Sequence, residues 1–121
     1  LHFDCGCDEA GIYAYVYPNR AFEIYLCPEF RNAAVEGTDS RAGTIIHELS
    51  HFSVLADTHD HVYSQRGAQN LASNQPDLAI ENADNYEYFA EDTPHLEIIE
   101  QGEQGAILFS GHDYCYGFQG R

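Results

Sequence analysis

Residues 47–51 read His-Glu-Leu-Ser-His, and this H-E-x-x-H pattern constrains the chain more than any other feature. On a helix, residues four apart lie on one face, so His47 and His51 can direct imidazole nitrogens at one metal ion. Glu48 can reach a water molecule on that ion and act as general base. The pattern predicts a hydrolytic zinc site, and the alternative is two surface histidines on an acidic helix.

The residues around the motif predict an amphipathic helix from about residue 40 to about residue 55. Four apolar residues would face the core: Ile45, Ile46, Leu49 and Phe52. Three residues suited to an N-cap precede them: Thr38, Asp39 and Ser40. The motif therefore lies on a helix that the sequence can both start and bury.

Length and composition limit the function classes. The 121 residues, 44% of them hydrophobic, suit one domain with one core. The net charge of −15 argues against nucleic acid and anionic membranes as partners, and it either attracts cationic substrates or only keeps the chain soluble. No apolar run approaches the length of a membrane span. The chain begins at Leu1, so we expect a processed product or a fragment of a longer precursor.

Four cysteines, Cys5, Cys7, Cys27 and Cys115, predict two disulfides formed in an oxidising, extracellular compartment. A cysteine zinc site is the alternative, but the spacing does not match the usual paired ligands. Cys5 and Cys7 are too close to pair comfortably. The residues alone leave two pairings open, Cys7–Cys27 with Cys5–Cys115, or Cys5–Cys27 with Cys7–Cys115.

The rest of the chain predicts a small sheet followed by helices. Residues 12–17 and 22–26 are rich in β-branched and aromatic residues and predict a hairpin around the turn at 18–20. A loop is expected at 29–39 and another at 56–63. Helices are expected at 64–72 and, after Pro76 in a first turn, to about residue 91. Short strands are expected at 96–99 and 106–109.

A catalytic zinc site needs a third protein ligand and leaves one position for water. Spacing offers several candidates: Asp57, His59, Asp60, His61, Glu81 and Glu87. Asp57 has the spacing of a metzincin ligand, but Val54 stands where that motif needs Gly. Spacing alone leaves the choice among the others open.

Residues 57–64, Asp-Thr-His-Asp-His-Val-Tyr-Ser, resemble the G-T-x-D-x-x-Y-G motif of the deuterolysin-type aspzincins. Further stretches over residues 3–91 resemble the fungal peptidyl-Lys metalloendopeptidase branch of that family. They are Phe3-Asp4-Cys5-x-Cys7, residues 13–20, residues 24–27, residues 37–44 and Asn82-Ala83-Asp84-Asn85-x-Glu87-Tyr88-Phe89. The resemblance implies an α+β, zincin-like fold, in which a small β-sheet or hairpin packs against the active-site helix and further helices.

The resemblance implies that His47, His51 and Asp60 bind one Zn²⁺ per chain. Glu48 would polarise the zinc-bound water and pass its proton to the leaving amine, and Tyr63 would hydrogen-bond the oxyanion. Histidines 59 and 61 would then be cleft-rim residues. The three other histidines, at positions 2, 95 and 112, are expected at the surface.

The resemblance also implies that Asp84 and Glu87 line the pocket for the residue after the scissile bond. Spaced by three on a helix, both carboxylates face the same way and suit a lysine ammonium; the alternative is a solvated helix face. All five basic residues of the chain are Arg. A protease that cuts before lysine would therefore not cut its own copies, which supports the resemblance; the alternative is an acidic composition with an Arg preference.

The chain departs from the family pattern at three places. Asp57 and Ser64 replace the two motif glycines, which puts the loop backbone in question. The family's helical segment before the first cysteines is not found in residues 1–93, and residues 94–121 extend past its usual end, within one domain over 1–121. The resemblance pairs Cys7 with Cys27, and Cys115 then becomes the replacement partner for Cys5.

These observations predict a secreted zinc endopeptidase that acts on protein or peptide substrates and prefers Lys after the scissile bond. A second chain or a homo-oligomer would complete the cleft if the missing helices are needed. One alternative is a truncated peptidase-derived zinc-binding or regulatory module with little or no proteolytic activity. A third hypothesis is a broader deuterolysin-type enzyme that acts on small basic proteins.

Overall fold

Strand β3 (Glu23–Leu26) forms the centre of a three-stranded sheet in the computed structural model, which describes residues 1–92. Strand β2 (Ala14–Tyr15) pairs antiparallel with it, with Tyr15 opposite Tyr25, so the predicted hairpin is confirmed. The predicted strand over 12–17 is too long, because only two of its residues keep a regular ladder before the turn at Pro18. The sheet therefore ends in a short edge strand.

Strand β1 (His2–Asp4) pairs parallel with β3 on its other side and was not predicted. Three residues are too few for a recognisable alternation, and the pairing joins residues about twenty apart in sequence, such as Phe3 and Ile24. The predicted strands at 96–99 and 106–109 lie outside the described residues.

The motif lies on α2 (Arg41–Ser50), as predicted, and Ser40 is its N-cap. The Ser40 hydroxyl accepts a hydrogen bond from the Gly43 amide at 2.9 Å. The helix ends at Ser50 rather than near residue 55. After it, the amides of both Leu55 and Asp57 bond to one carbonyl, that of Phe52, which closes the chain into turns.

Four other helices complete the described chain: α1 (Pro28–Asn32), α3 (Gln65–Asn74), α4 (Pro76–Ala79) and α5 (Ala83–Glu91). The predicted loop at 29–39 is therefore partly helical, because Pro28 starts a helical turn instead of only ending a strand. The helix predicted from Pro76 to about residue 91 is broken at 80–82. There the backbone of His59 bonds to Glu81 and Ala83 and forms a bridge opposite Asn82.

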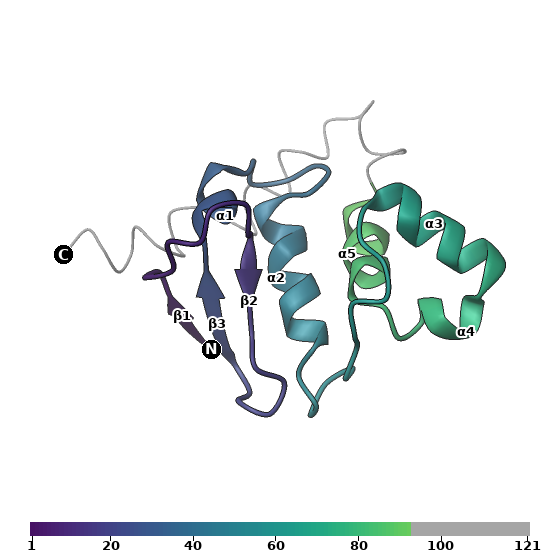
Figure 1. Cartoon of the computed structure of the whole chain (residues 1–121), viewed down its shortest axis with the longest axis horizontal. Helices are drawn as coiled ribbons and strands as arrows, with labels where there is room; N and C mark the ends of the chain where they lie inside the picture. Colours follow the sequence, from purple (N-terminus) through teal and green to yellow (C-terminus); the bar gives the residue numbers. More distant parts are fainter. Residues whose placement is uncertain (93–121) are drawn as a thin grey trace.

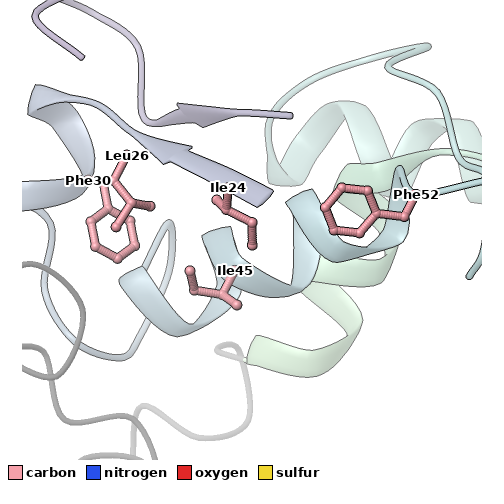
Figure 2. Packing of buried hydrophobic residues seen from close by; sticks show 5 residues of the cluster. All are labelled: Ile24, Leu26, Phe30, Ile45 and Phe52. Carbon is pink, nitrogen blue, oxygen red and sulfur yellow. The ribbon is translucent and has the colours of Figure 1, made fainter. Parts of the chain in front are cut away.

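Helix α2 forms the middle layer of the molecule, between the sheet and α5, and α3 and α4 lie on the far side of α5 (Figure 1). The apolar core fills the interface between the sheet and α2 (Figure 2). Its buried members are Ile24, Leu26, Phe30, Ile45 and Phe52. These observations confirm the α+β fold class and place the motif helix at the centre of the fold.

One disulfide and two hydrogen bonds attach the N-terminal segment to α1 and its N-cap. Cys7 and Cys27 form a disulfide. Arg31 donates hydrogen bonds to the carbonyls of Cys5 and Cys7 at 3.3 and 2.9 Å. The predicted Cys5–Cys115 pair involves a residue outside the described range. No helix within residues 1–92 is both long enough and apolar enough to span a membrane.

Candidate metal centre and active-site cleft

Helix α2 presents His47, Glu48 and His51 on its face toward α5 and the loop that follows it. All three side chains are buried, with Glu48 only 5% exposed. The two imidazole rings lie one helical turn apart, with centroids 4.9 Å from each other. The helix thus brings both histidines to one point, as the motif predicts.

The loop between α2 and α3 brings Asp60 to the same point. Its Oδ1 lies 3.2 Å from the Nε2 atoms of both His47 and His51. These two nitrogens are themselves 3.2 Å apart. Ligand atoms that surround a tetrahedral zinc ion at about 2.0–2.1 Å stand about 3.3–3.4 Å from one another. The three atoms therefore form a triangle that fits zinc.

Of the alternative third ligands, the structure brings only Asp60 to the two Nε2 atoms. Among the described residues, the groups able to hold a metal are His47 with His51 and Asp60, and His47 with Asp84 and Glu87. The second group lies around the other ring nitrogen of His47. Four candidates from spacing are in neither group: Asp57, His59, His61 and Glu81.

Asn82 fixes the loop that carries Asp60. Its fully buried side chain accepts hydrogen bonds from the amides of His61 and Val62, at 2.7 and 3.1 Å, and donates one to the Val62 carbonyl at 3.2 Å. The sequence assigned Asn82 no role. It lies inside the single helix predicted from Pro76 to about residue 91, and its place in the stretch that resembles the aspzincin family was the only signal for it.

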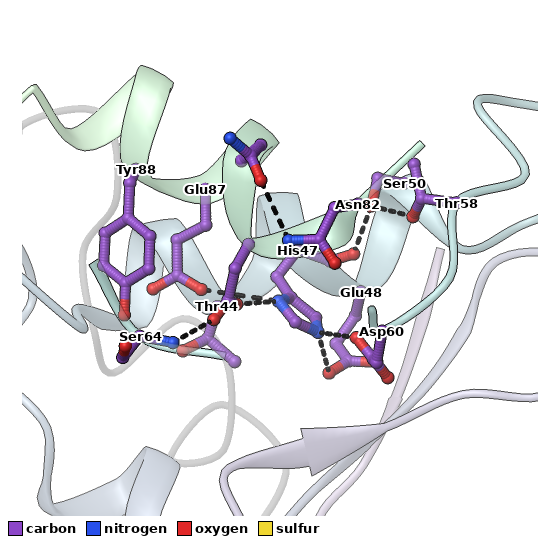
Figure 3. A network of polar contacts seen from close by, with 12 residues as sticks. Thr44, His47, Glu48, Ser50, Thr58, Asp60, Ser64, Asn82, Glu87 and Tyr88 are labelled. Atoms are coloured by element: carbon purple, nitrogen blue, oxygen red, sulfur yellow. Dashed lines mark hydrogen bonds and ion pairs between the residues drawn. The ribbon is translucent and has the colours of Figure 1, made fainter. Parts of the chain in front are cut away.

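Both histidines have an acceptor on the nitrogen that faces away from the triangle. His47 Nδ1 donates to Asp84 Oδ1 at 2.7 Å, and His51 Nδ1 donates to the Thr58 carbonyl at 3.0 Å. These bonds leave each Nε2 free to bind a metal, which is the usual arrangement around histidine ligands. Figure 3 shows His47 with Glu87 on one side of its ring and Asp60 on the other.

Asp84 and Glu87 extend from α5 and are both buried. Both oxygens of Asp84 are engaged, since Oδ1 accepts from His47 and Oδ2 accepts from the Ser64 amide at 2.7 Å. Glu87 is less engaged with His47, because its Oε1 lies 3.5 Å from His47 Nδ1. The pair predicted to bind substrate therefore divides into a carboxylate that holds a histidine and one that faces the cleft.

The carboxylates around His47 make the position between the three proposed ligands favourable for positive charge. Burial by itself would lower the pKa of His47, but hydrogen bonds to Asp60, Asp84 and Glu87 raise it to about 12. Burial opposes the change at Asp60 as well, yet its contacts with His47 and His51 hold the pKa of Asp60 well below its usual range. A metal cation is the ligand that suits such a site.

Glu48 and Tyr63 stand beside the triangle. Glu48 Oε2 lies 3.8 Å from His47 Nε2, and burial raises the pKa of Glu48 to about 7, within the range of a general base. Tyr63 is 64% exposed at the cleft. Partial burial and the charge of Asp60 raise the pKa of Tyr63, so its phenol keeps the proton it needs to donate a hydrogen bond.

A cleft of about 560 Å³ opens over these residues. One wall is the chain around β2, residues 11–16. The opposite wall consists of residues from the loop and α5, among them Tyr63, Asp84, Glu87 and Tyr88. His47, Glu48 and His51 of α2 line the floor between them.

The loop keeps a backbone suited to glycine although the sequence has none there. Asp57 and Ser64 have φ values of +53° and +82°. Both therefore adopt the left-handed region that motif glycines would occupy at no cost. The two non-glycine residues therefore store strain in this loop.

Residues 1–91 match the aspzincin family, described as lysine-specific metallo-endopeptidase. The chain belongs to the aspzincin family. A zinc peptidase structure from Grifola frondosa superposes with a TM-score of 0.76 at 52% identity, and covers 78% of this chain and 58% of that one. The zincin-like fold that the sequence predicted is therefore confirmed.

Relatives of this aspzincin include an extracellular protease of Aeromonas hydrophila, 60% identical over 78% of the chain and 27% of the relative. A peptidyl-Lys metalloendopeptidase of Armillaria mellea is 54% identical over 76% of the chain and 26% of the relative. The enzyme of the same name from Pleurotus ostreatus is 55% identical over 78% of the chain and 56% of the relative. The chain thus spans about a quarter to just over half the length of these proteins.

Proposed function

We propose that the chain is the catalytic part of a secreted zinc endopeptidase, with one Zn²⁺ per chain and a preference for lysine after the scissile bond. The observation that carries the proposal is the triangle of His47, His51 and Asp60, whose atoms are 3.2 Å apart beside the buried Glu48. The cleft above them is open to a substrate. The names of the relatives support the same activity, compartment and specificity.

In this proposal His47, His51 and Asp60 hold zinc, which supplies Lewis-acid chemistry. Glu48 takes the proton of the attacking water and delivers it to the leaving amine, for which a pKa of about 7 is well placed. Tyr63 donates a hydrogen bond to the oxyanion from the cleft wall. Asp84 keeps His47 in the orientation that its ligand role needs.

Strand β2 supports a peptide as substrate. It is an edge strand of the sheet and it lines the cleft. An extended peptide can add to such an edge through backbone hydrogen bonds, whatever its side chains are. Its scissile bond would then lie over the floor formed by α2.

Glu87 supports the preference for lysine. It is buried in the cleft wall, and no Arg or Lys is among the described residues that line the cleft. Asp84 has both oxygens occupied by His47 and Ser64, so Glu87 is the carboxylate that a lysine ammonium would reach. Tyr88 and Asp39, which are hydrogen-bonded to each other, line the same region and add polar groups around it.

The experiment compares the parent with Glu48→Gln on a peptide that contains one lysine. We expect the parent to produce a new N-terminal lysine, read by mass spectrometry, and the variant to be about 10²–10⁴-fold slower with its zinc retained. Equal rates would refute the role of Glu48. Cleavage before other residues would retain the enzyme and refute the lysine pocket.

The alternative of a zinc-binding module that cleaves nothing is less well supported, because a buried Glu48 beside the ligands has no use in it. The same experiment decides between them, since zinc binding without cleavage by the parent would favour the module. Completion of the cleft by a second chain is tested by the mass of the active species in solution.

A further inference from the structure

Glu91 is a buried acid that the roles above leave unused. It ends α5 and is 8% exposed. Its Oε2 accepts hydrogen bonds from the amide and the hydroxyl of Ser40, at 2.9 and 2.8 Å, and its Oε1 accepts from the Asp39 amide at 3.1 Å. The carboxyl group is thus fixed to the residues that begin the motif helix.

The close approach of Glu91 to α2 depends on Gly43. A Cβ atom at that position would lie 1.9 Å from Glu91 Oε2 and 2.9 Å from Glu87 Cγ. Any side chain at position 43 would therefore displace both acidic side chains. The space between α2 and α5 at Gly43 is therefore filled by the side chains of Glu87 and Glu91.

Glu91 also contacts Glu87, which lies one helical turn before it on α5. A Cβ atom at Gly43 would meet both side chains, and a hydrogen bond between the two carboxyl groups is one cause of the raised pKa of Glu91. Such a bond requires that one of them carries a proton. Glu87 lines the cleft, whereas Glu91 is not among the residues that line it. Glu91 therefore stands behind Glu87 as seen from the substrate.

We infer that Glu91 is a positioning residue for substrate specificity, which holds the Glu87 carboxylate at the place where it meets a lysine ammonium. This inference rests on the proposed function. Both oxygens of the Glu91 carboxyl group are anchored, Oε2 to Ser40 and Oε1 to Asp39, and the same side chain lies against Glu87 beside Gly43. The contact of Glu87 itself with α2 is longer, since its Oε1 lies 3.5 Å from His47 Nδ1, which is bonded to Asp84 at 2.7 Å.

The protonation of Glu91 agrees with this arrangement. Burial raises the pKa of Glu91 to about 8, and the charge of Glu87 adds to that effect against the hydrogen bonds from Ser40. A protonated Glu91 can donate a hydrogen bond to Glu87 while it accepts those of Ser40.

The test measures kcat/KM of the full chain on two peptides that differ only in Lys or Arg after the scissile bond. Glu91→Asp shortens the side chain by one methylene, so it cannot span from Ser40 to Glu87. Glu91→Gln keeps the length, an acceptor for Ser40 and a donor for Glu87, and sacrifices the longer Asp39 contact. Glu81→Asp, the same change at an exposed residue, is the control.

We expect Glu91→Asp to lower the ratio of the Lys rate to the Arg rate about tenfold or more, and Glu91→Gln and Glu81→Asp to keep it within about threefold. The ratio is independent of the folded fraction, because the same molecules cut both peptides. Circular dichroism and zinc content accompany each variant.

An unchanged ratio in Glu91→Asp, with both rates reduced alike, would show a purely structural role and overturn the inference alone. A tenfold loss of the Lys-to-Arg ratio in Glu91→Gln would also overturn the inference, because this variant keeps the hydrogen bonds to Ser40 and Glu87 on which the inference rests. If the parent cuts neither peptide, the proposed function fails and the inference fails with it. The rates of the parent protein therefore distinguish a failure of the proposed function from a failure of the inference alone.

Discussion

The two faces of α2 are buried in opposite ways. Toward the sheet, Ile45 packs with Ile24, Leu26 and Phe30 in an apolar core. Toward α5, the same helix buries His47 against carboxylates and Ser40 against Glu91. The first face gains free energy from the removal of apolar surface from water, whereas the second must compensate the desolvation of each polar group by a hydrogen bond.

The two faces of α2 therefore have different roles. The apolar face specifies where the helix sits, and it contains no group that could react. The polar face contributes little net stability and holds the metal ligands and the acids around them in fixed orientations. Substitutions on the two faces should therefore affect different measurements.

The largest stability effect is expected on the apolar face. Phe30→Ala should lower the free energy of unfolding by about 3–5 kcal/mol, because it leaves a cavity between α1 and α2. Zinc affinity of the folded protein should be unchanged. Denaturant titration and zinc titration measure the two quantities. Phe89→Ala is the control, since Phe89 is 87% exposed and its loss should cost less than about 0.5 kcal/mol.

Gly43→Ala tests the packing of the polar face. The added methyl group would collide with Glu91 and Glu87, so we expect a loss of about 1–3 kcal/mol in the free energy of unfolding. Gly67→Ala in α3 is the matched control, because a Cβ there meets nothing nearer than 3.2 Å. Equal thermal stability of the two variants would mean that the polar face tolerates expansion.

Asp84→Asn tests whether the polar face tunes the metal ligands. Asparagine offers one acceptor oxygen where Asp84 serves both His47 and Ser64, so one of these bonds is lost. We expect zinc affinity to fall about 10–100-fold, measured by competition with a chelator. Asp77→Asn on the exposed surface of α4 should leave the affinity unchanged.

The smallest effect is a pH dependence of stability on the polar face. The pKa of Glu91 is raised in the folded protein, from 4.5 to about 8, so the unfolded chain loses this proton first. Stability from this group is therefore fully present below about pH 4.5 and decreases as pH rises to about 8.

Glu91→Gln should remove this contribution, so the difference in unfolding free energy between variant and parent should shift in favour of the variant as pH rises from 5 to 8. Denaturant titrations at several pH values measure this difference. Glu87 and the zinc ligands are the same in both proteins, so the comparison isolates the change at position 91. Parallel curves would contradict the prediction.

The sequence predicted the apolar face better than the polar one. The motif helix, a set of N-cap candidates that includes Ser40, and the β2–β3 hairpin follow from the local sequence, and Asp60 follows from the resemblance of its loop to the aspzincin motif. Glu91 could not be found in this way, because its partner Ser40 lies 51 residues earlier. The break before α5 was missed because it depends on the bridge between His59 and Asn82, which no local pattern reveals.

Ser64 has a backbone conformation and a side-chain role that favour different residues. Its φ of +82° and ψ of +157° fall in a region that is essentially restricted to glycine, yet its hydroxyl caps α3 by accepting from the Gly67 amide at 3.0 Å. Glycine would relieve the backbone but would lose the cap. Replacement of Ser64 by glycine therefore makes two changes of opposite sign in the free energy of unfolding, so the residue that suits this backbone and the residue that suits the start of α3 are different.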